Sequence, residues 1–167
     1  MYLLEAAYLR LLGSTEFQAL IGEDVGLDDA EEDPWYSGWV FQGLSDTGEP
    51  YRQPEGSGMA AVVVSSRGGW ASPNQTNTAS FPLLTVFVFA DCSRDENGNL
   101  SARDAESRVR RVAEVVDPLF HDAANRVHSW GTFPVVSCLR HSELSIRDVP
   151  NGDGVVRGEL TYEVVLG

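Results

Sequence analysis

The sequence predicts an α+β protein with a mostly antiparallel sheet of four to five strands. Helical periodicity is confined to residues 3–20 and 101–127, and strongly apolar runs typical of strands lie between them. Residues 135–166 form two long arms around an Asn-Gly-Asp-Gly turn. We therefore expect an N-terminal helix, a central helix pair and a C-terminal β-hairpin within one domain of 167 residues.

The N-terminal helix is predicted from one apolar stripe. Its members recur at i, i+3, i+4, i+7 and i+8, and they are Leu4, Ala7, Tyr8, Leu11 and Leu12. Gly13 and Ser14 interrupt this pattern, which then continues in a second short helix with Phe17, Leu20 and Ile21.

Residues 22–58 differ from the rest of the chain. They hold seven glycines, three prolines and ten acids against one base, Arg52. A cluster of aromatic residues surrounds a short predicted strand, Gly38–Gln42, and includes Trp35 and Trp39. Such a long irregular segment is usually functional or disordered, and its aromatic residues need burial or a partner. We expect residues 22–33, with seven acids and no base, to be mobile in an isolated subunit.

Two strands are predicted in the middle of the chain. Residues 60–65 (AAVVVS) form the first, and residues 83–90 (LLTVFVFA) form the second. Because both faces of the second run are apolar, we expect it to be central and covered on both sides. Between them we expect a polar loop, residues 68–80, that contains Trp70.

The central helix pair is predicted from its caps and stripes. Ser101 and Asp104 are spaced as a capping box. Pro118 suits the first position of a second helix capped by Asp117, because proline is costly in a helix interior. The buried residues of the first helix are Val109, Val112, Ala113 and Val116, and those of the second are Phe120, Ala123, Ala124 and Val127.

The C-terminal hairpin has arms at residues 135–148 and 155–166, joined by a turn at 151–154. Alternation along the second arm separates two faces. The apolar face carries Val156, Leu160, Tyr162, Val164 and Leu166. The polar face carries Arg157, Glu159, Thr161 and Glu163. One face should pack on the core, and the other should meet water or a neighbour.

Charge excludes several functions. Twelve arginines and no lysine stand against 25 acids, for a formal net charge of −13, so the chain should repel nucleic acid.

The sequence has no apolar run long enough to span a membrane and no signal-peptide pattern at Met1–Glu5, so we expect a soluble protein made in the cytoplasm. Cys92 and Cys138 lack a metal or redox spacing and are expected to be reduced, buried thiols.

No catalytic or cofactor motif is present. Walker, Rossmann, GxSxG and HExxH patterns are all missing from the sequence. His121 and His128 are too far apart for helical metal ligands, and His141 lies elsewhere. Residues 95–106 imitate an EF-hand loop, but Leu100 occupies the position that requires glycine. The acids at 28–33 are typical of a solvated face. We expect no enzyme, no cofactor and no metal.

The order of these elements, with the ending RGELTYEVV at residues 157–165, resembles the tail terminator proteins of long-tailed bacteriophages, also called minor tail or head-to-tail joining proteins. The resemblance implies a virion protein that forms a ring, usually of six subunits. Such a ring caps the tail tube, stops tail polymerisation and joins the tail to the head connector. Its partners would be further copies of itself, the tail tube protein and the head–tail connector, with DNA passing through the lumen without specific binding.

Two alternatives remain at this stage. The chain could be another connector or tube subunit, such as an adaptor or stopper, or a monomeric acidic protein-binding module. In either case the predicted interface residues are Trp35, Trp39, Trp70, Arg157, Glu159 and Glu163. Aromatic residues and arginines are the usual anchors of protein interfaces.

Overall fold

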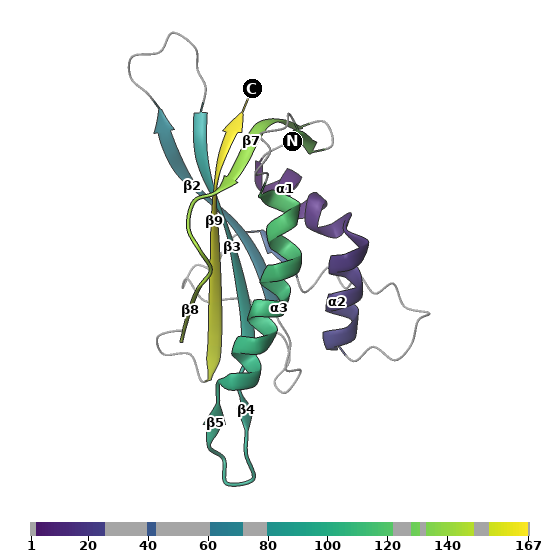
Figure 1. Cartoon of the computed structure of the whole chain (residues 1–167), viewed down its shortest axis with the longest axis vertical. Helices are drawn as coiled ribbons and strands as arrows, with labels where there is room; N and C mark the ends of the chain where they lie inside the picture. The colour runs from purple at the N-terminus through teal and green to yellow at the C-terminus, as the bar shows by residue number, and fades with distance from the viewer. Residues whose placement is uncertain are drawn as a thin grey trace.

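The computed structural model describes residues 3–25, 40–42, 61–71, 80–121, 128–130, 133–148 and 154–166. Its elements confirm the predicted α+β class (Figure 1). In chain order they are α1 (Leu3–Leu12), α2 (Thr15–Val25), β1 (Val40–Gln42), β2 (Ala61–Ala71), β3 (Ser80–Asp91), β4 (Ser93–Arg94), β5 (Leu100–Ser101), α3 (Arg103–Phe120), β6 (His128–Trp130), β7 (Phe133–Arg140), β8 (Ser145–Asp148) and β9 (Val155–Leu166).

One large sheet has the strand order β1-β2-β3-β9-β7-β6, and β8 also pairs with β9. All described pairings in it are antiparallel except that of β1 with β2. The four long strands β2, β3, β9 and β7 form its body, and β1, β6 and β8 are short additions of three or four residues. β3 lies between β2 and β9, as expected for a strand that is apolar on both faces.

The predicted C-terminal hairpin is present, but its first arm is broken. β7 pairs with residues 162–166 of β9, and β8 pairs with residues 156–159 of the same strand. Residues 141–144 lie between β7 and β8, and the His141 N–H donates to the Thr161 carbonyl at 2.7 Å. The arm therefore carries extra residues opposite one short stretch of β9, as in an extended bulge.

The N-terminal helix divides where the sequence indicated. The Gly13 N–H donates to the Leu9 carbonyl at 2.9 Å and closes α1, and the Ser14 hydroxyl accepts the Phe17 N–H at 3.2 Å and caps α2. α2 continues to Val25, four residues into the acidic segment that was expected to be mobile from residue 22. Residues 26–33 lie outside the described residues.

The predicted break at Pro118 is wrong, because α3 is a single helix with Pro118 in its last turn. Phe120 is the last residue of this helix. Its ring packs edge-on against Trp130 at a centroid distance of 5.4 Å, and in a tilted arrangement against Tyr162 at 5.5 Å. Burial of these rings compensates for the hydrogen bond that proline cannot make. Ala123, Ala124 and Val127 of the expected second helix lie outside the described residues.

The capping box at Ser101 is also wrong. Ser101 belongs to β5 and pairs with Ser93, so the helix begins later, with Ala102 as its N-cap and no side-chain cap. Asp104 and Glu106 still lie in the first turn, where negative charge stabilises the positive end of the helix dipole.

The loop predicted at residues 68–80 is shorter than expected. β2 runs to Ala71 and β3 begins at Ser80, so Trp70 lies in a strand and pairs with Phe81. The ladder shifts register between Arg67 and Trp70, around Gly68 and Gly69. A glycine pair in a strand is typical of a bulge, and here it does not end the strand.

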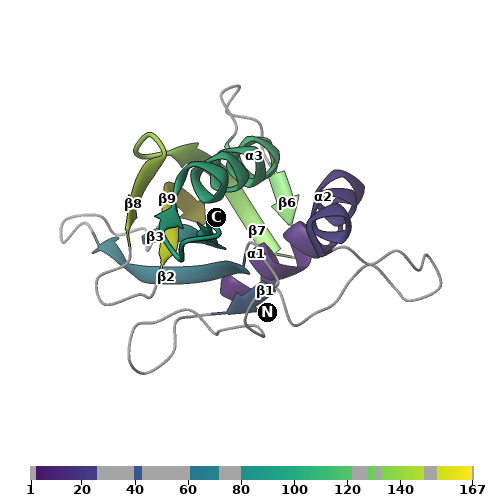
Figure 2. The same ribbon diagram turned by 90° about the horizontal axis from the view of Figure 1, so that it is seen from below.

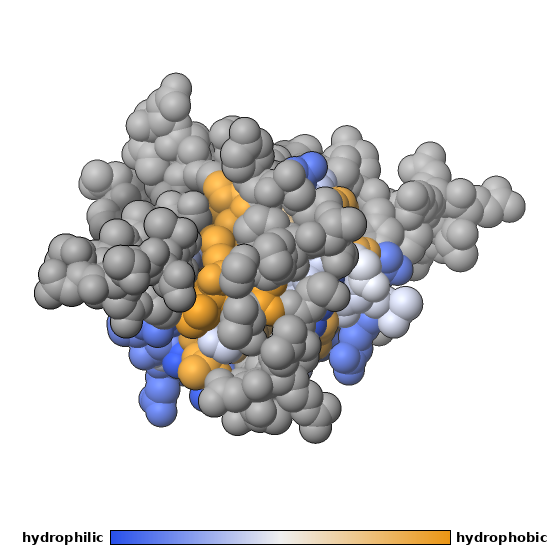
Figure 3. All heavy atoms as spheres, turned by 90° about the horizontal axis from the view of Figure 1, so that it is seen from above, coloured by the Kyte–Doolittle hydropathy of each residue, from blue (hydrophilic) through white to orange (hydrophobic). Residues whose placement is uncertain are grey.

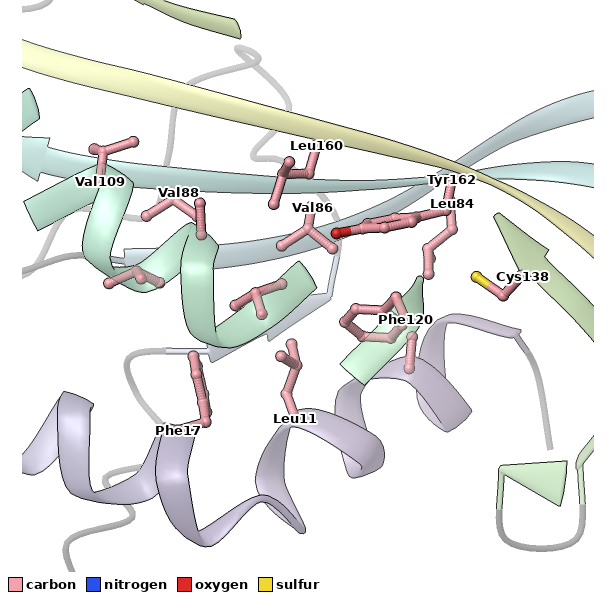
Figure 4. Close-up of a cluster of buried hydrophobic side chains, with 14 of the residues drawn as sticks. Leu11, Phe17, Leu84, Val86, Val88, Val109, Phe120, Cys138, Leu160 and Tyr162 are labelled. Atoms are coloured by element: carbon pink, nitrogen blue, oxygen red, sulfur yellow. The ribbon is translucent and has the colours of Figure 1, made fainter. Parts of the chain in front are cut away.

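The helices cover one face of the sheet, with α3 against β9, β3 and β7 and α1 against β2 and β1 (Figure 2). Figure 4 shows their side chains meeting in one apolar cluster. α1 and α2 contribute Leu11 and Phe17, α3 contributes Val109 and Phe120, and the strands contribute Leu84, Val86, Val88, Cys138, Leu160 and Tyr162. The apolar face predicted for the last arm is therefore the core face.

A glycine sets how closely α3 approaches β9. A Cβ added at Gly158 would lie 2.3 Å from Cγ1 of Val109, far inside contact distance. Gly158 thus lets the helix lie directly on the strand at this point, and this contact fixes the position of α3 over the centre of the sheet.

Candidate functional site

The face of the sheet opposite the helices is the first candidate site. Alternation along β3 places Leu83, Thr85, Phe87 and Phe89 on this face, because their neighbours in sequence belong to the helix-side core. Phe87 is 2% exposed, Phe89 3% and Thr85 2%, yet none of the three belongs to the helix-side cluster. The rings of Phe87 and Phe89 stack at a centroid distance of 6.2 Å. This face therefore has an aromatic centre of its own.

β9 brings the predicted polar residues beside that aromatic centre. In the register of β3 with β9, Arg157 lies opposite Phe89, and Glu159 lies opposite Phe87. Directly paired residues share a face and have adjacent side chains. Further along, the hydroxyls of Thr85 and Thr161 lie 3.4 Å apart. The result is a mixed surface in which charged groups border buried rings.

Arg157 is only partly satisfied by its contacts on this face. Its guanidinium lies over the ring of Phe87 at 5.4 Å from the centroid, a cation–π contact. Its Nε is buried and has no hydrogen-bond partner among the described residues. Its Nη2 lies 3.9 Å from Oε2 of Glu159, beyond hydrogen-bond length. Arginine has five N–H donors, so this side chain retains unused donor capacity.

Arg147 on β8 competes for the same carboxylate. Its Nη2 donates to Oε2 of Glu159 at 3.3 Å, and its side chain is 54% exposed. One carboxylate thus serves two guanidinium groups, Arg147 and Arg157. The three residues, here called the arginine cluster, carry a local positive excess on a chain with a formal charge of −13.

The structure brings together only part of the predicted interface. Arg157 and Glu159 meet in the arginine cluster, and Glu163 is exposed further along β9, opposite Leu83. Trp70 lies in β2, where its backbone pairs with Phe81. Trp35 and Trp39 lie outside the described residues.

Sequence reasoning missed Arg147 and the two phenylalanines as members of this surface. The apolar alternation of β3 predicted burial on both faces, which is a usable signal for Phe87 and Phe89. Arg147 gave no signal, because β8 is only four residues long and its pairing partner is decided by the break at residues 141–144.

A second polar group lies at the C-terminal end of α3, on the helix side. Oδ1 of Asp117 accepts the Tyr162 hydroxyl at 3.0 Å, and Oδ2 accepts Nη1 of Arg140 at 2.9 Å. The Arg140 N–H donates to Nδ1 of His121 at 2.9 Å. Burial, and then the charge of Asp117, raise the pKa of Tyr162 far above its ordinary value. Tyr162 therefore stays protonated and acts as a fixed donor that ties β9 to α3.

Arg10 completes the attachment of α1 at the same end. Its Nε donates to the Leu119 carbonyl, one of the orphan carbonyls at the end of α3, and its guanidinium lies 5.6 Å from the Trp130 ring centroid. Burial lowers the pKa of Arg10 from its ordinary value. These contacts are structural, since every named donor and acceptor joins two elements of the fold.

The loop that imitates an EF-hand is the tip of the β4–β5 hairpin. Oδ1 of Asp95 accepts the N–H groups of Asn97 at 2.9 Å and Asn99 at 2.8 Å, and Oδ2 accepts Nδ2 of Asn99 at 2.9 Å. Gly98 has a φ of 79° in the turn. These hydrogen bonds, the Asn99 side chain first, lower the pKa of Asp95. The carboxylate therefore orders the turn.

The described part of the chain contains no group of three His, Cys, Asp or Glu residues arranged to hold a metal ion. None of its helices is both long and apolar enough to cross a membrane. Cys138 is buried and Cys92 is half-buried, and neither forms a disulfide.

The molecule is thus an α+β protein whose sheet is covered by helices on one face and, on the other, has a buried aromatic centre bordered by charged residues. No family model matches the chain, and no curated protein matches its sequence. It is similar in structure to a chain of the "Virion of native gene transfer agent (GTA) particle". The TM-score is 0.60 at 16% identity, over 98% of this chain and 93% of that chain. At this identity the likeness shows a shared fold.

Proposed function

We propose that the protein is a structural component of a phage-type virion and has no catalytic activity. The observation that carries this proposal is the likeness to a virion chain along almost the whole length of both proteins. The polar residues with fixed partners, Asp117, Tyr162 and Arg140, join elements of the fold and are not arranged around a substrate site.

Within that class, we propose a tail terminator: a homo-oligomeric ring, with six subunits as the expected number, that caps the tail tube and joins it to the head connector. Two observations support this role. The order of elements resembles that family, and the sheet face opposite the helices carries an exposed arginine, Arg147, at the border of a buried aromatic centre, which suits a subunit contact. A ring of such acidic subunits would also let DNA pass without binding it tightly.

The first test is assembly in solution. Light scattering coupled to size-exclusion chromatography should give a closed oligomer, and negative-stain images should show rings that bind one end of purified tail tubes. A protein that stays monomeric at millimolar concentration and in the presence of tube ends would contradict the proposal and favour the acidic binding module.

The second test separates a terminator from its relatives. Deleting the gene from the phage genome that encodes it should give tails of uncontrolled length that fail to join heads. Tails of normal length that stay unjoined would instead indicate an adaptor or stopper. Complete loss of tubes would indicate a tube subunit, and normal infectious particles would remove the virion role.

A further inference from the structure

The β4–β5 hairpin is an ordered arm. Residues 93–101 are all exposed, and the hairpin extends beyond the N-terminal end of α3 and the body of the sheet (Figure 1). A ribbon with two-residue strands is marginal by itself. The hydrogen bonds to Asp95 and the Arg94 Nη1 donation to the Gly98 carbonyl at 3.2 Å hold its tip in one conformation. An arm that is both ordered and without core contacts is suited to meeting another molecule.

The root of the arm is fixed to the sheet. The Cys92 N–H donates to the Gly154 carbonyl at 2.6 Å, at the start of β9. Gly154 has a φ of 77°, and a Cβ there would lie 2.8 Å from Cδ2 of Leu100. The close packing of Leu100 on Gly154 sets the direction of the arm relative to β9. The tip therefore reaches a defined place with little loss of conformational entropy on binding.

The tip has an excess of one negative charge, since Asp95 and Glu96 stand against Arg94. Glu96 is exposed at the turn, next to Asp95, whose carboxylate is occupied by the turn itself. The arginine cluster has the opposite excess, since Glu159 alone serves Arg147 and Arg157, and Arg147 is more than half exposed. The two sites lie on different parts of the same chain. They are complementary in charge, and each has capacity left for a partner.

We infer that the tip of the β4–β5 arm of one copy docks on the arginine cluster of the next copy, with the Glu96 carboxylate pairing with the exposed Arg147 guanidinium. The inference rests on the proposed ring and names the contact that would build it. A closed ring requires a head-to-tail contact between two different surfaces of the subunit, and the arm tip and the arginine cluster are two such surfaces. Acids outnumber bases 25 to 12, so two copies repel each other unless a contact places a base opposite an acid.

Charge reversal tests the contact. Arg147→Glu and Glu96→Arg are made singly and together in the full chain, and the association constant is measured by sedimentation velocity with imaging of rings. Each single reversal should weaken association about tenfold or more, and the double variant should restore it to within about threefold of the wild type. Arg110→Glu and Glu114→Arg, exposed on α3, are the matched controls for net charge and should leave association unchanged.

The outcomes are distinguishable. Single reversals that assemble like the wild type, or a double variant that fails to recover while keeping its thermal unfolding midpoint, would overturn the arm contact and leave the ring intact. A wild-type chain that never associates would overturn the proposed function as well. Recovery in the double variant alone, with both controls unaffected, would establish the pairing.

Discussion

On the helix-covered face of the sheet, alternate residues of β3 and β9 are apolar and meet one cluster, whereas the opposite face sets two phenylalanines of β3 beside charged residues of β9. The first face has its partner within the chain, in α1, α2 and α3. The second combines burial with an arginine that lacks a full set of partners. The difference indicates that the first face provides stability, and that the exposed charged border of the second face, at Arg147, is suited to recognition. Figure 3 shows the molecule from above. Among the described residues, the hydrophobic ones form a band, and hydrophilic residues lie on both sides of it.

The largest effect is expected from the helix-covered face. Phe120→Ala removes a buried ring that packs on both Trp130 and Tyr162. We expect a loss of about 3–5 kcal/mol in the free energy of unfolding, measured with denaturant. A loss below about 1 kcal/mol would show that the end of α3 is not part of the core.

Overpacking the closest helix–strand approach should have the next largest effect. Gly158→Ala places a methyl group against Val109, which must move, and should cost about 1–3 kcal/mol. The double variant Gly158→Ala/Val109→Ala frees that space, so its cost should be less than the sum of the two single changes. Additive costs would mean that Val109 is not the obstacle.

The polar tie between β9 and α3 is expected to be weaker. Tyr162→Phe keeps the ring and removes the donor to Asp117, which retains Arg140 as its partner. We expect a loss of about 1–2 kcal/mol in unfolding free energy, because the acceptor is charged but partly exposed. An unchanged stability would show that water replaces the hydroxyl without cost.

A substitution on the opposite face of the sheet should change association more than stability. Arg157→Met keeps an unbranched side chain over Phe87 and removes the unpartnered Nε, while Glu159 keeps Arg147. Replacing a poorly paired buried charge by an apolar group is often neutral, so we expect a change within about 0.5 kcal/mol. Association should weaken in the same variant. A loss above about 2 kcal/mol in the monomer would assign Arg157 to stability and end the contrast between the faces.

The smallest effect is local to the arm. The pKa of Asp95 is held below its ordinary value of 3.8, because its carboxylate accepts hydrogen bonds from Asn99 and Asn97. A depressed pKa means that the carboxylate orders the turn at and above pH 3.8, and that this order is lost as pH falls through the lower folded-state value. A carbon-detected NMR titration should give a midpoint below 3.8, and Asn99→Ala should raise it.

Much of the fold could be predicted from patterns that are local in the sequence. The apolar stripe of α1, the break at Gly13 and the two apolar faces of β3 all depend on residues within one element. The errors occurred where distant contacts override a local preference. Pro118 remains helical because Phe120 packs on Trp130 and Tyr162, and Ser101 is a strand residue because it pairs with Ser93.

The sequence by itself determined the class of fold, the acidic charge and the polar face of β9, because alternation and composition do not depend on what lies nearby. It could not determine that Arg157 lies over Phe87, or that Arg147 shares Glu159 with it. Those contacts join β3, β8 and β9, whose alignment depends on strand register and on the break at residues 141–144. Register is a property of packed strands, so only the tertiary structure decided which side chains meet.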